Sequence, residues 1–256
     1  MRSESIDNNN LNPKVVVIFA TKNEEYTIEN SISMAKKSDY EPEVLVVDAH
    51  SSDKTAELAI AAGAVVIRQS KQLFPGKGLA MKEGLKEAIE RMSADFIIFL
   101  DADIKNLTQD WVDQLVGAII DDNCDMSRGF YTRHARDAAV TKLIARPMLH
   151  IFFPELSHFE QPLSGEVCAR TQVWKDLLAK ESIPEGWGID VWFLIEGVMS
   201  GFNIKEHFLG QKDHTSFEDY KEDISKLSKM AEQVEFTIIR EAIKYGRMEF
   251  QRNVPV

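Results

Sequence analysis

The stretch Phe96-Ile97-Ile98-Phe99-Leu100-Asp101-Ala102-Asp103 runs directly from an apolar segment into two carboxylates. A continuous apolar run of this length is typical of a strand that is buried on both faces of a parallel sheet. Residues two apart at a strand end point to the same side, so Asp101 and Asp103 are expected to project together. Such a pair could hold a hard divalent cation, although an isolated Asp-x-Asp more often caps a helix or lies in a solvated loop.

Strands and helices are predicted to alternate on both sides of this stretch. Further strands are predicted at residues 15–19, 44–47, 64–67 and 126–131, and helices at 51–61, 78–91, 111–120, 140–149, 173–179, 189–199 and 217–245, with 150–166 irregular. This alternation predicts an α/β fold with a mostly parallel sheet flanked by helices. Ligands bind such sheets at the carboxyl ends of the strands, where residues 21–24, 48–53 and 101–103 would gather.

The composition limits the class of partner. The chain has 256 residues, 44% of them apolar, and a formal net charge of -11. Binding to nucleic acid or to an anionic membrane surface needs a positive footprint, which this charge does not supply. Two cysteines, Cys124 and Cys168, exclude a disulfide framework and a cysteine-rich zinc site. Because no signal-peptide core and no apolar run of roughly twenty residues is present, a cytoplasmic protein without a membrane span is expected.

Three further motifs carry groups suited to chemistry. Lys77, between two glycines at the start of a predicted helix, could face phosphate together with the backbone amides, although Gly-Lys-Gly alone is more often a flexible turn. Trp187 could pack on a sugar ring, and Asp190 could bind sugar hydroxyls or act as a base. The alternative for Asp190 is a favourable interaction with a helix N-terminus. His214, in a polar loop, is a candidate imidazole ligand for a metal.

Taken in order, these motifs resemble those of the GT-A glycosyltransferases, whose fold is Rossmann-like, and within them the glucosyl-3-phosphoglycerate synthases of glycosyltransferase family 81, related to family 2. Widely shared segments are residues 17–25, 46–53, 76–78 and 101–103, and more specific ones are 129–131, 145–149, 154–156, 161–166, 186–190 and His214. The resemblance implies that a hexose, glucose or mannose, is moved from a nucleotide-diphosphate sugar, UDP-glucose or GDP-mannose, to a small hydroxy acid such as 3-phosphoglycerate, with retention.

The resemblance also implies roles for individual residues. The donor would be bound by Ala20, Thr21, Lys22, Asn23, Glu24, Asp48, Ser51, Lys77, Asp101, Ala102, Asp103, Trp187 and Gly188. Asp103 and His214 would hold Mg2+ or Mn2+, with Asp103 the stronger ligand candidate of the two aspartates and Asp101 serving the ribose or supporting the site. Asp103 and Asp190 would be catalytic. The acceptor would be bound by Arg136, Thr141, Gly165 and Ser216.

The chain departs from the family pattern at three places. Residues 20–24 read Ala-Thr-Lys-Asn-Glu where the family has Pro-Ala-Leu-Asn-Glu, and Ser216 replaces an asparagine. The family also holds the acceptor phosphate with Gly-Arg-Val-Thr, whereas residues 138–141 read Ala-Ala-Val-Thr. A guanidinium is the natural fork for phosphate, so a phosphorylated acceptor requires that Arg128, Arg133 or Arg136 takes this place.

These expectations divide the chain and leave alternatives open. Residues 1–13 are expected to be a disordered tail, 14–125 the nucleotide-sugar-binding half, 126–216 the acceptor-binding and catalytic half, and 217–256 a C-terminal helical extension suited to packing or to a homodimer. The alternatives are an inverting GT-A transferase that acts on a polyprenyl phosphate or another acceptor, a sugar nucleotidyltransferase that releases pyrophosphate, and a nucleotide-sugar-binding module without activity.

Overall fold

The computed structural model describes residues 13–73, 75–133, 137–214 and 225–248, and within them a single seven-stranded sheet organises the chain. Its strands are β1 (Val15–Thr21), β2 (Glu43–Asp48), β3 (Val65–Arg68), β4 (Phe96–Asp101), β5 (Met126–Thr132), β6 (Val167–Arg170) and β7 (Ile204–Gln211). They lie in the order β3-β2-β1-β4-β6-β5-β7. The two predicted halves of the chain therefore share one sheet.

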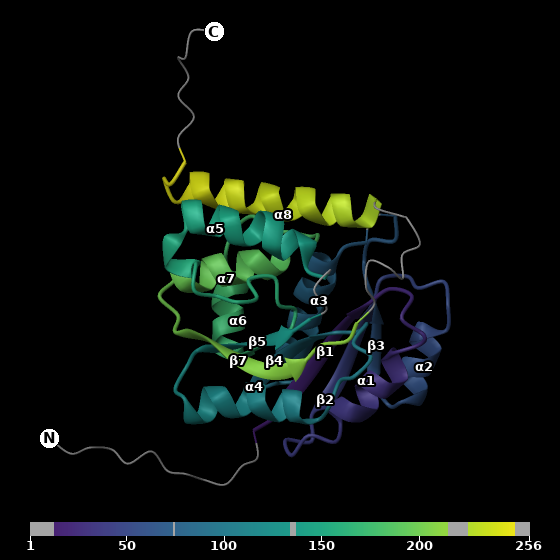
Figure 1. The fold of residues 1–256 in the computed structure, drawn as a ribbon. Helices are drawn as coiled ribbons and strands as arrows, with labels where there is room; N and C mark the ends of the chain where they lie inside the picture. The colour runs from purple at the N-terminus through teal and green to yellow at the C-terminus, as the bar shows by residue number, and fades with distance from the viewer. Residues whose placement is uncertain (1–12, 74, 134–136, 215–224, 249–256) are drawn as a thin grey trace, which may run out of the picture.

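Helices cover both faces of this sheet (Figure 1). One face carries α1 (Ile28–Ala35), α2 (Thr55–Ala61) and α4 (Asp110–Asp121). The other carries α3 (Lys77–Glu90), α6 (Thr171–Leu178) and α7 (Ile189–Met199), with α5 (Arg146–Phe152) and α8 (Ser225–Lys244) outside them. A π-helical turn, Thr141–Ala145, precedes α5, and a short 3-10 turn, Pro154–Leu156, follows it. In the described part of the chain, no helix is long and apolar enough to cross a membrane.

The alternation of side chains along β1 explains the two layers. Val16 and Ile18 are buried in the hydrophobic cluster beneath α3 and α7, whereas Val17 and Phe19 are buried in the cluster beneath α1 and α4. A strand that is buried on both faces in this way needs a continuous apolar run. This is why the strands at residues 15–19, 44–47 and 96–100 could be predicted from the sequence.

An aromatic cluster anchors α6 and α7 to the strand that ends in Asp101. Trp174 of α6 donates a hydrogen bond from Nε1 to the carbonyl of Ile97, 3.0 Å away, and packs edge-on against Phe99 at 5.3 Å between ring centroids. Phe193 of α7 lies 5.1 Å from Trp174. Such pairs each contribute about 0.5–1.5 kcal/mol beyond the burial of area. The cluster therefore fixes where α7 begins relative to the end of β4.

The structure confirms a mostly parallel sheet, with one exception in the second half. β6 runs antiparallel to both β4 and β5, whereas the remaining pairs are parallel. The expected irregular segment 150–166 is partly helical, because α5 continues to Phe152 and the 3-10 turn follows. Helix α7 has the predicted bounds, and α8 is described from Ser225, so residues 217–224 of that prediction lie outside the described residues. The predicted tail also lies outside them, apart from Pro13.

Candidate functional site

The carboxyl ends of β1, β2 and β4 meet at one edge of the sheet, as predicted. Ala20 is in register with Val47 on one side and Asp101 on the other, and Thr21 is in register with Asp48. This register brings the loops that follow the three strands together. Most of the predicted donor-binding residues lie in these loops or at the strand ends that precede them.

Hydrogen bonds lock the loop after β1 to the loop after β2. The backbone N–H of Asn23 donates to Oγ of Ser51 at 2.9 Å, and Oδ1 of Asn23 accepts from the N–H of Ser52 at 2.8 Å. Asn23 has φ of 59°, a left-handed conformation that asparagine tolerates better than most residues. Asp48 is fully buried, and both of its carboxylate oxygens accept from the N–H of Ser51 at 3.2 Å. The two loops thus form one preorganised surface.

Glu24 joins this surface to the Asp-x-Asp stretch. Its N–H donates to Oγ1 of Thr55 at 2.8 Å. Burial, together with the nearby carboxylate of Asp103, raises the pKa of Glu24 to about 8. The neighbouring Lys22 is exposed and Ala102 is buried. At neutral pH the Glu24 carboxyl is therefore mostly protonated and adds little negative charge beside Asp103.

Lys77 connects Asp101 to Asp190 at the centre of the site. Its Nζ lies 2.9 Å from Oδ1 of Asp101 and 2.8 Å from Oδ2 of Asp190. Burial alone would lower the pKa of Lys77, but the two carboxylates outweigh it and hold this pKa well above its usual range. Burial raises the pKa of Asp190 to about 6, an effect that Lys77 partly offsets. Oδ1 of Asp190 is buried without a hydrogen-bond partner among the described residues.

A second lysine, Lys212, binds the other oxygen of Asp101. Its Nζ lies 2.7 Å from Oδ2 of Asp101 and 2.6 Å from Oε1 of Glu166, which is itself fully buried. Burial would raise the pKa of Asp101, but Lys212 and Lys77 hold it well below its usual value. Sequence reasoning missed Lys212 and Glu166. Both oxygens of Asp101 are thus engaged by lysines.

Asp103 and His214, the two predicted metal ligands, lie side by side. Nδ1 of His214 is 3.8 Å from Oδ2 of Asp103, and the two side chains are 16% and 24% exposed. A β-bridge between Ile104 and His214 holds the two segments together, and the N–H of Lys105 donates to the carbonyl of Asp213 at 2.8 Å. Among the described residues, no group of three or more His, Cys, Asp or Glu side chains is placed to hold a metal ion.

The N-terminus of α3 differs from the expectation that its backbone amides face phosphate. The N–H groups of Gly78 and Leu79 donate to the carbonyls of Gly186 and Glu185, at 3.2 and 2.9 Å. These amides therefore hold the loop at residues 184–188, so the Gly-Lys-Gly motif serves as a packing site for a second loop. The side chain of Lys77 alone reaches the charged network.

The loop at residues 184–188 carries Trp187 and leads into Asp190. The Trp187 side chain is half-buried, with Nζ of Lys226 located 5.7 Å from its ring centroid. Gly188 is buried and precedes the first residue of α7. Asp190 lies in the first turn of α7, where a helix N-terminus also favours a carboxylate. The dipole and the ion pair with Lys77 thus act on the same side chain.

The predicted acceptor residues are only partly within the described chain. Thr141 is buried at the start of the π-helical turn, and Gly165 lies so close to Asp101 that an added Cβ would be 2.2 Å from its Oδ1. Arg136 and Ser216 lie outside the described residues. Gly165 therefore packs directly against the central carboxylate.

Two of the three arginines considered for an acceptor phosphate, Arg128 and Arg133, lie within the described residues. Arg128 is fully buried, and its Nη2 donates to the carbonyls of Pro162 and Ser164 at 3.2 and 3.1 Å. Arg133 donates from Nη2 to the hydroxyl of Tyr131 at 2.6 Å. The full burial of Arg128 keeps it from an acceptor phosphate, whereas Nε of Arg133 has no hydrogen-bond partner among the described residues, and Arg136 lies outside them.

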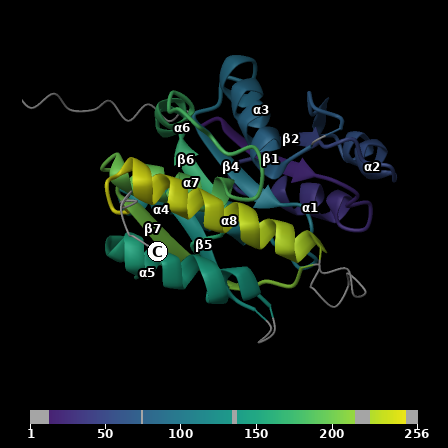
Figure 2. The same cartoon turned by 90° about the horizontal axis from the view of Figure 1, so that it is seen from above.

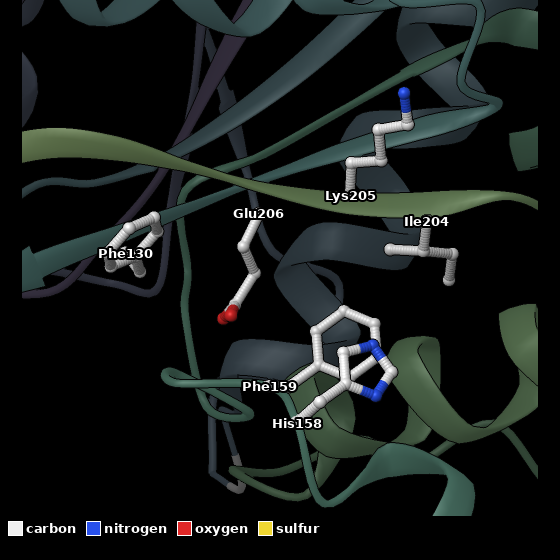
Figure 3. Close-up of a pocket in the computed structure, with 6 residues that line it drawn as sticks. All are labelled: Phe130, His158, Phe159, Ile204, Lys205 and Glu206. Atoms are coloured by element: carbon white, nitrogen blue, oxygen red, sulfur yellow. The ribbon is translucent and has the colours of Figure 1, made fainter.

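A separate pocket of about 380 Å³ lies beside β7 and shares no residue with this site (Figure 3). Phe130, His158, Phe159 and Glu206 line it together with Ile204 and Lys205, and Lys205 points to the opposite side of the strand from Glu206. The Glu206 carboxylate already accepts from the N–H groups of Glu160 and Gln161, at 2.6 and 2.8 Å. Its hydrogen bonds thus serve to hold the segment after α5 against β7.

Comparison with known proteins places this geometry in context. Residues 16–231 match the family model described as mannosylglycerate synthase, GT domain. The glucosyl-3-phosphoglycerate synthase of Petrotoga mobilis is 30% identical over 256 residues, covering 92% of this chain and 75% of that protein. The enzyme of the same name from Mycobacterium tuberculosis is 32% identical over 202 residues, covering 71% of this chain and 60% of that protein.

Solved structures agree with the sequence relatives. The glucosyl-3-phosphoglycerate synthase of Mycobacterium tuberculosis, in complex with Mn2+, UDP and phosphoglyceric acid, superposes with a TM-score of 0.77 at 30% identity. The match covers 90% of this chain and 78% of that one. Other structures of that enzyme hold Mg2+ with UDP, or Mn2+ with UDP-glucose. The predicted GT-A fold is thereby confirmed.

Proposed function

The chain belongs to the mannosylglycerate synthase GT-domain family, whose named relatives are hexosyltransferases, and we propose that it transfers a hexose from a UDP-sugar to a small hydroxy acid with retention. The observation that carries the proposal is the position of the Asp103–His214 pair beside the Lys77–Asp190 ion pair, at the end of β4. The first pair suits a metal bound to diphosphate. The second suits the sugar next to it.

The proposed cofactor is Mg2+ or Mn2+, held by Asp103 and His214. A carboxylate oxygen and an imidazole nitrogen, both partly exposed, fit such a cation, which takes its remaining ligands from water and phosphate oxygens. When bound, the cation stabilises the negative charge that develops on the departing diphosphate. Asp101 stays outside the proposed ligand set because lysines engage both of its oxygens.

The proposed donor is UDP-glucose, with GDP-mannose as the alternative. The linked loops after β1 and β2 would hold the nucleoside through Ala20 to Glu24, Asp48 and Ser51. Support comes from the hydrogen bonds that already join these loops, because a preorganised surface loses little entropy on binding. Support for UDP comes from the relative that was solved with this nucleotide.

Asp190 is proposed to bind sugar hydroxyls rather than to act as the base of an inverting enzyme. Its Oδ2 is held by Lys77 at 2.8 Å, and the side chain is only 2% exposed. A general base needs an oxygen within reach of the acceptor hydroxyl, whereas the unpartnered Oδ1 needs only a donor such as a sugar hydroxyl to be satisfied. This arrangement favours retention.

The proposed acceptor is 3-phosphoglycerate, and glycerate is the alternative to test beside it. The names of the relatives favour the phosphorylated acid, and so does the phosphoglyceric acid that is bound in the solved Mycobacterium tuberculosis enzyme. The burial of Arg128, together with the replacement of the family arginine by Ala139, favours an acceptor without phosphate. Thr141 and Gly165 are proposed to lie against the acceptor, together with Arg136 and Ser216.

A donor-by-acceptor matrix tests this proposal. UDP-glucose, GDP-mannose and their epimers are each combined with 3-phosphoglycerate, glycerate and a polyprenyl phosphate, with Mn2+ or Mg2+ present. We expect transfer from UDP-glucose to a small acid, release of UDP, and an α-linked product by proton NMR. A β-linked product would establish inversion, and release of pyrophosphate from a nucleoside triphosphate would establish the nucleotidyltransferase alternative. No transfer from any donor would contradict the proposal.

Homodimerisation through α8 remains part of the proposal. Phe236 and Ile243 of α8 are 63% and 42% exposed, which leaves apolar side chains on the outer helix. Light scattering of the full chain at several concentrations tests it, and a monomer at all concentrations would contradict it.

A further inference from the structure

The loop at residues 184–188 is enclosed between two helices that are distant in sequence. On one side, α3 donates the N–H groups of Gly78 and Leu79 to its carbonyls. On the other side, Oε1 of Gln233 in α8 accepts the N–H of Trp187 at 2.8 Å. Helix α8 lies over α7, the helix that this loop leads into (Figures 1 and 2). The loop is therefore held from both sides rather than free at its tip.

The two glycines of this loop show how closely α8 packs on it. A Cβ at Gly186 would lie 2.1 Å from Oε1 of Gln233, and a Cβ at Gly188 would lie 2.0 Å from Oγ1 of Thr237. Non-bonded contacts to a Cβ atom are essentially never this short, so side chains of α8 occupy the space that a larger residue would need. The hydroxyl of Thr237 is itself fixed, because it donates to the carbonyl of Gln233 at 2.8 Å. The fit is between two specific surfaces.

The same contacts control the relative position of Lys77 and Asp190. Lys77 precedes Gly78 at the start of α3, and Asp190 follows Gly188 by two residues. The bonds from α3 tie these two segments together directly, and Gln233 closes the loop from the opposite side. If the loop moved away from α3, the 2.8 Å ion pair between Lys77 and Asp190 would have to stretch or break.

We propose that Gln233 is a positioning residue for hexose transfer: it holds the loop at residues 184–188 so that Asp190 and Trp187 face the donor sugar. This inference rests on the proposed function, because it assigns the loop to the sugar. Gln233 acts through the Trp187 backbone and touches no reacting atom. Loss of its acceptor oxygen leaves the Trp187 N–H unpaired and lets the loop open towards solvent.

Amide hydrogen exchange tests the structural half of the proposal. Gln233→Ala is compared with Glu235→Ala, a matched truncation of an exposed residue on the same helix. We expect faster exchange in the peptide covering residues 184–190 in Gln233→Ala, and wild-type exchange there in Glu235→Ala, with unchanged protection of the β1 and β4 peptides in both. Equal exchange of the 184–190 peptide in the two variants would overturn the proposal. This readout requires no substrate.

Kinetics test the functional half. A displaced loop should lower kcat for hexose transfer by roughly tenfold to a hundredfold in Gln233→Ala, since small misplacements of binding groups cost this much. The dissociation constant of UDP with Mn2+ should stay unchanged, because the loops proposed to hold the nucleoside follow β1 and β2, and the hydrogen bonds of the described residues show no contact between them and Gln233. Gln233→Glu keeps an acceptor oxygen and should retain most of kcat. A general loss of structure would instead weaken UDP binding and would not be rescued by glutamate.

Failure of the positioning role can be distinguished from failure of the proposed function. Faster exchange without a change in kcat would overturn the positioning role and leave the proposed function intact. A wild-type chain that transfers no hexose would overturn the proposed function together with the positioning role, whereas the exchange data would still report on the contact between Gln233 and the loop.

Discussion

Lys212 lies 2.7 Å from Asp101, Nζ to Oδ2, although 111 residues separate them in the chain. Lys212 follows directly after β7, Asp101 is the last residue of β4, and Glu166, the second partner of Lys212, directly precedes β6. One buried ammonium thus joins the ends of three strands. Because β6 and β7 belong to the second half of the chain, this contact fixes the second half against the Asp-x-Asp stretch.

Replacing Lys212 by methionine should destabilise the fold strongly. The fully buried Glu166 would be left without its cation, whereas Asp101 would keep Lys77, and breaking a buried ion pair typically costs about 3–5 kcal/mol. Chemical denaturation at pH 7 measures the change in unfolding free energy. Lys14→Met is the matched control, because Lys14 forms an exposed ion pair with Glu43 at 2.8 Å, and exposed pairs contribute about 0–1 kcal/mol. Equal effects of the two substitutions would show that Lys212 has no special structural role.

Asp103→Ala and His214→Ala should each abolish the response to metal. Because a metal contributes several kcal/mol to the stabilisation of developing charge, transfer should fall by roughly a hundredfold or more. Calorimetric titration of UDP with Mn2+ present should show weakened binding in both variants. Asp39→Ala is the control. It removes an exposed carboxylate from the loop that follows α1, and it should behave as wild type. Wild-type metal dependence in Asp103→Ala would remove this residue from the proposed ligand set.

How much of the site the sequence predicts depends on how each residue signals its position. The ends of β1, β2 and β4 could be predicted because each strand is a continuous apolar run followed at once by polar residues. The positions of Lys212 and Glu166 could not be predicted. A single lysine or glutamate in a polar stretch of sequence is usually expected to be exposed to solvent. Strand β7, with the sequence Ile-Lys-Glu-His-Phe-Leu-Gly-Gln, lies at the sheet edge and lacks a buried pattern.

Strand β6 and helix α1 were missed because their composition is atypical. β6, Val-Cys-Ala-Arg, has a single β-branched residue, and α1, Ile-Glu-Asn-Ser-Ile-Ser-Met-Ala, contains two serines and an asparagine, which are poor helix formers. The role of Gly76 and Gly78 was also hidden, because a glycine that permits close approach of another loop looks identical in sequence to one that makes a turn. Only tertiary contacts separate the two cases.

The stability of the fold should depend on pH through Asp190. Burial raises the pKa of this carboxyl to about 6, with Lys77 acting in the opposite direction. Between its ordinary value of 3.8 and about 6, the folded chain holds a proton that the unfolded chain has released, so this group lowers stability as pH rises through that window.

Asp190→Asn removes this titration. Relative to wild type, the variant should therefore gain stability as pH increases from 4 to 7, while hexose transfer falls because the ion pair with Lys77 is lost. Urea unfolding at several pH values measures the difference. Asp176→Asn on the exposed face of α6 serves as the control. A stability difference between wild type and Asp190→Asn that is constant with pH would contradict the assignment.

Two helical glycines should respond in opposite directions to alanine. At Gly78 of α3, a Cβ would lie 2.1 Å from the carbonyl oxygen of Pro184, a backbone atom that cannot rotate away, so Gly78→Ala should destabilise the fold by about 1–3 kcal/mol through overpacking. At Gly117 of α4, the nearest heavy atom to a Cβ is 3.8 Å away. Gly117→Ala should therefore stabilise the fold by about 0.5–1 kcal/mol, because alanine loses less backbone entropy on folding than glycine.

Thermal unfolding of both variants, with wild type beside them, measures this contrast. Gly78→Ala should also reduce hexose transfer, because the displaced residues 184–188 lead directly to Asp190, whereas Gly117→Ala should leave transfer unchanged. Destabilisation by both substitutions would mean that helix interiors here tolerate no added methyl group. Stabilisation by both would mean that α3 and the loop at residues 184–188 do not pack as closely as described.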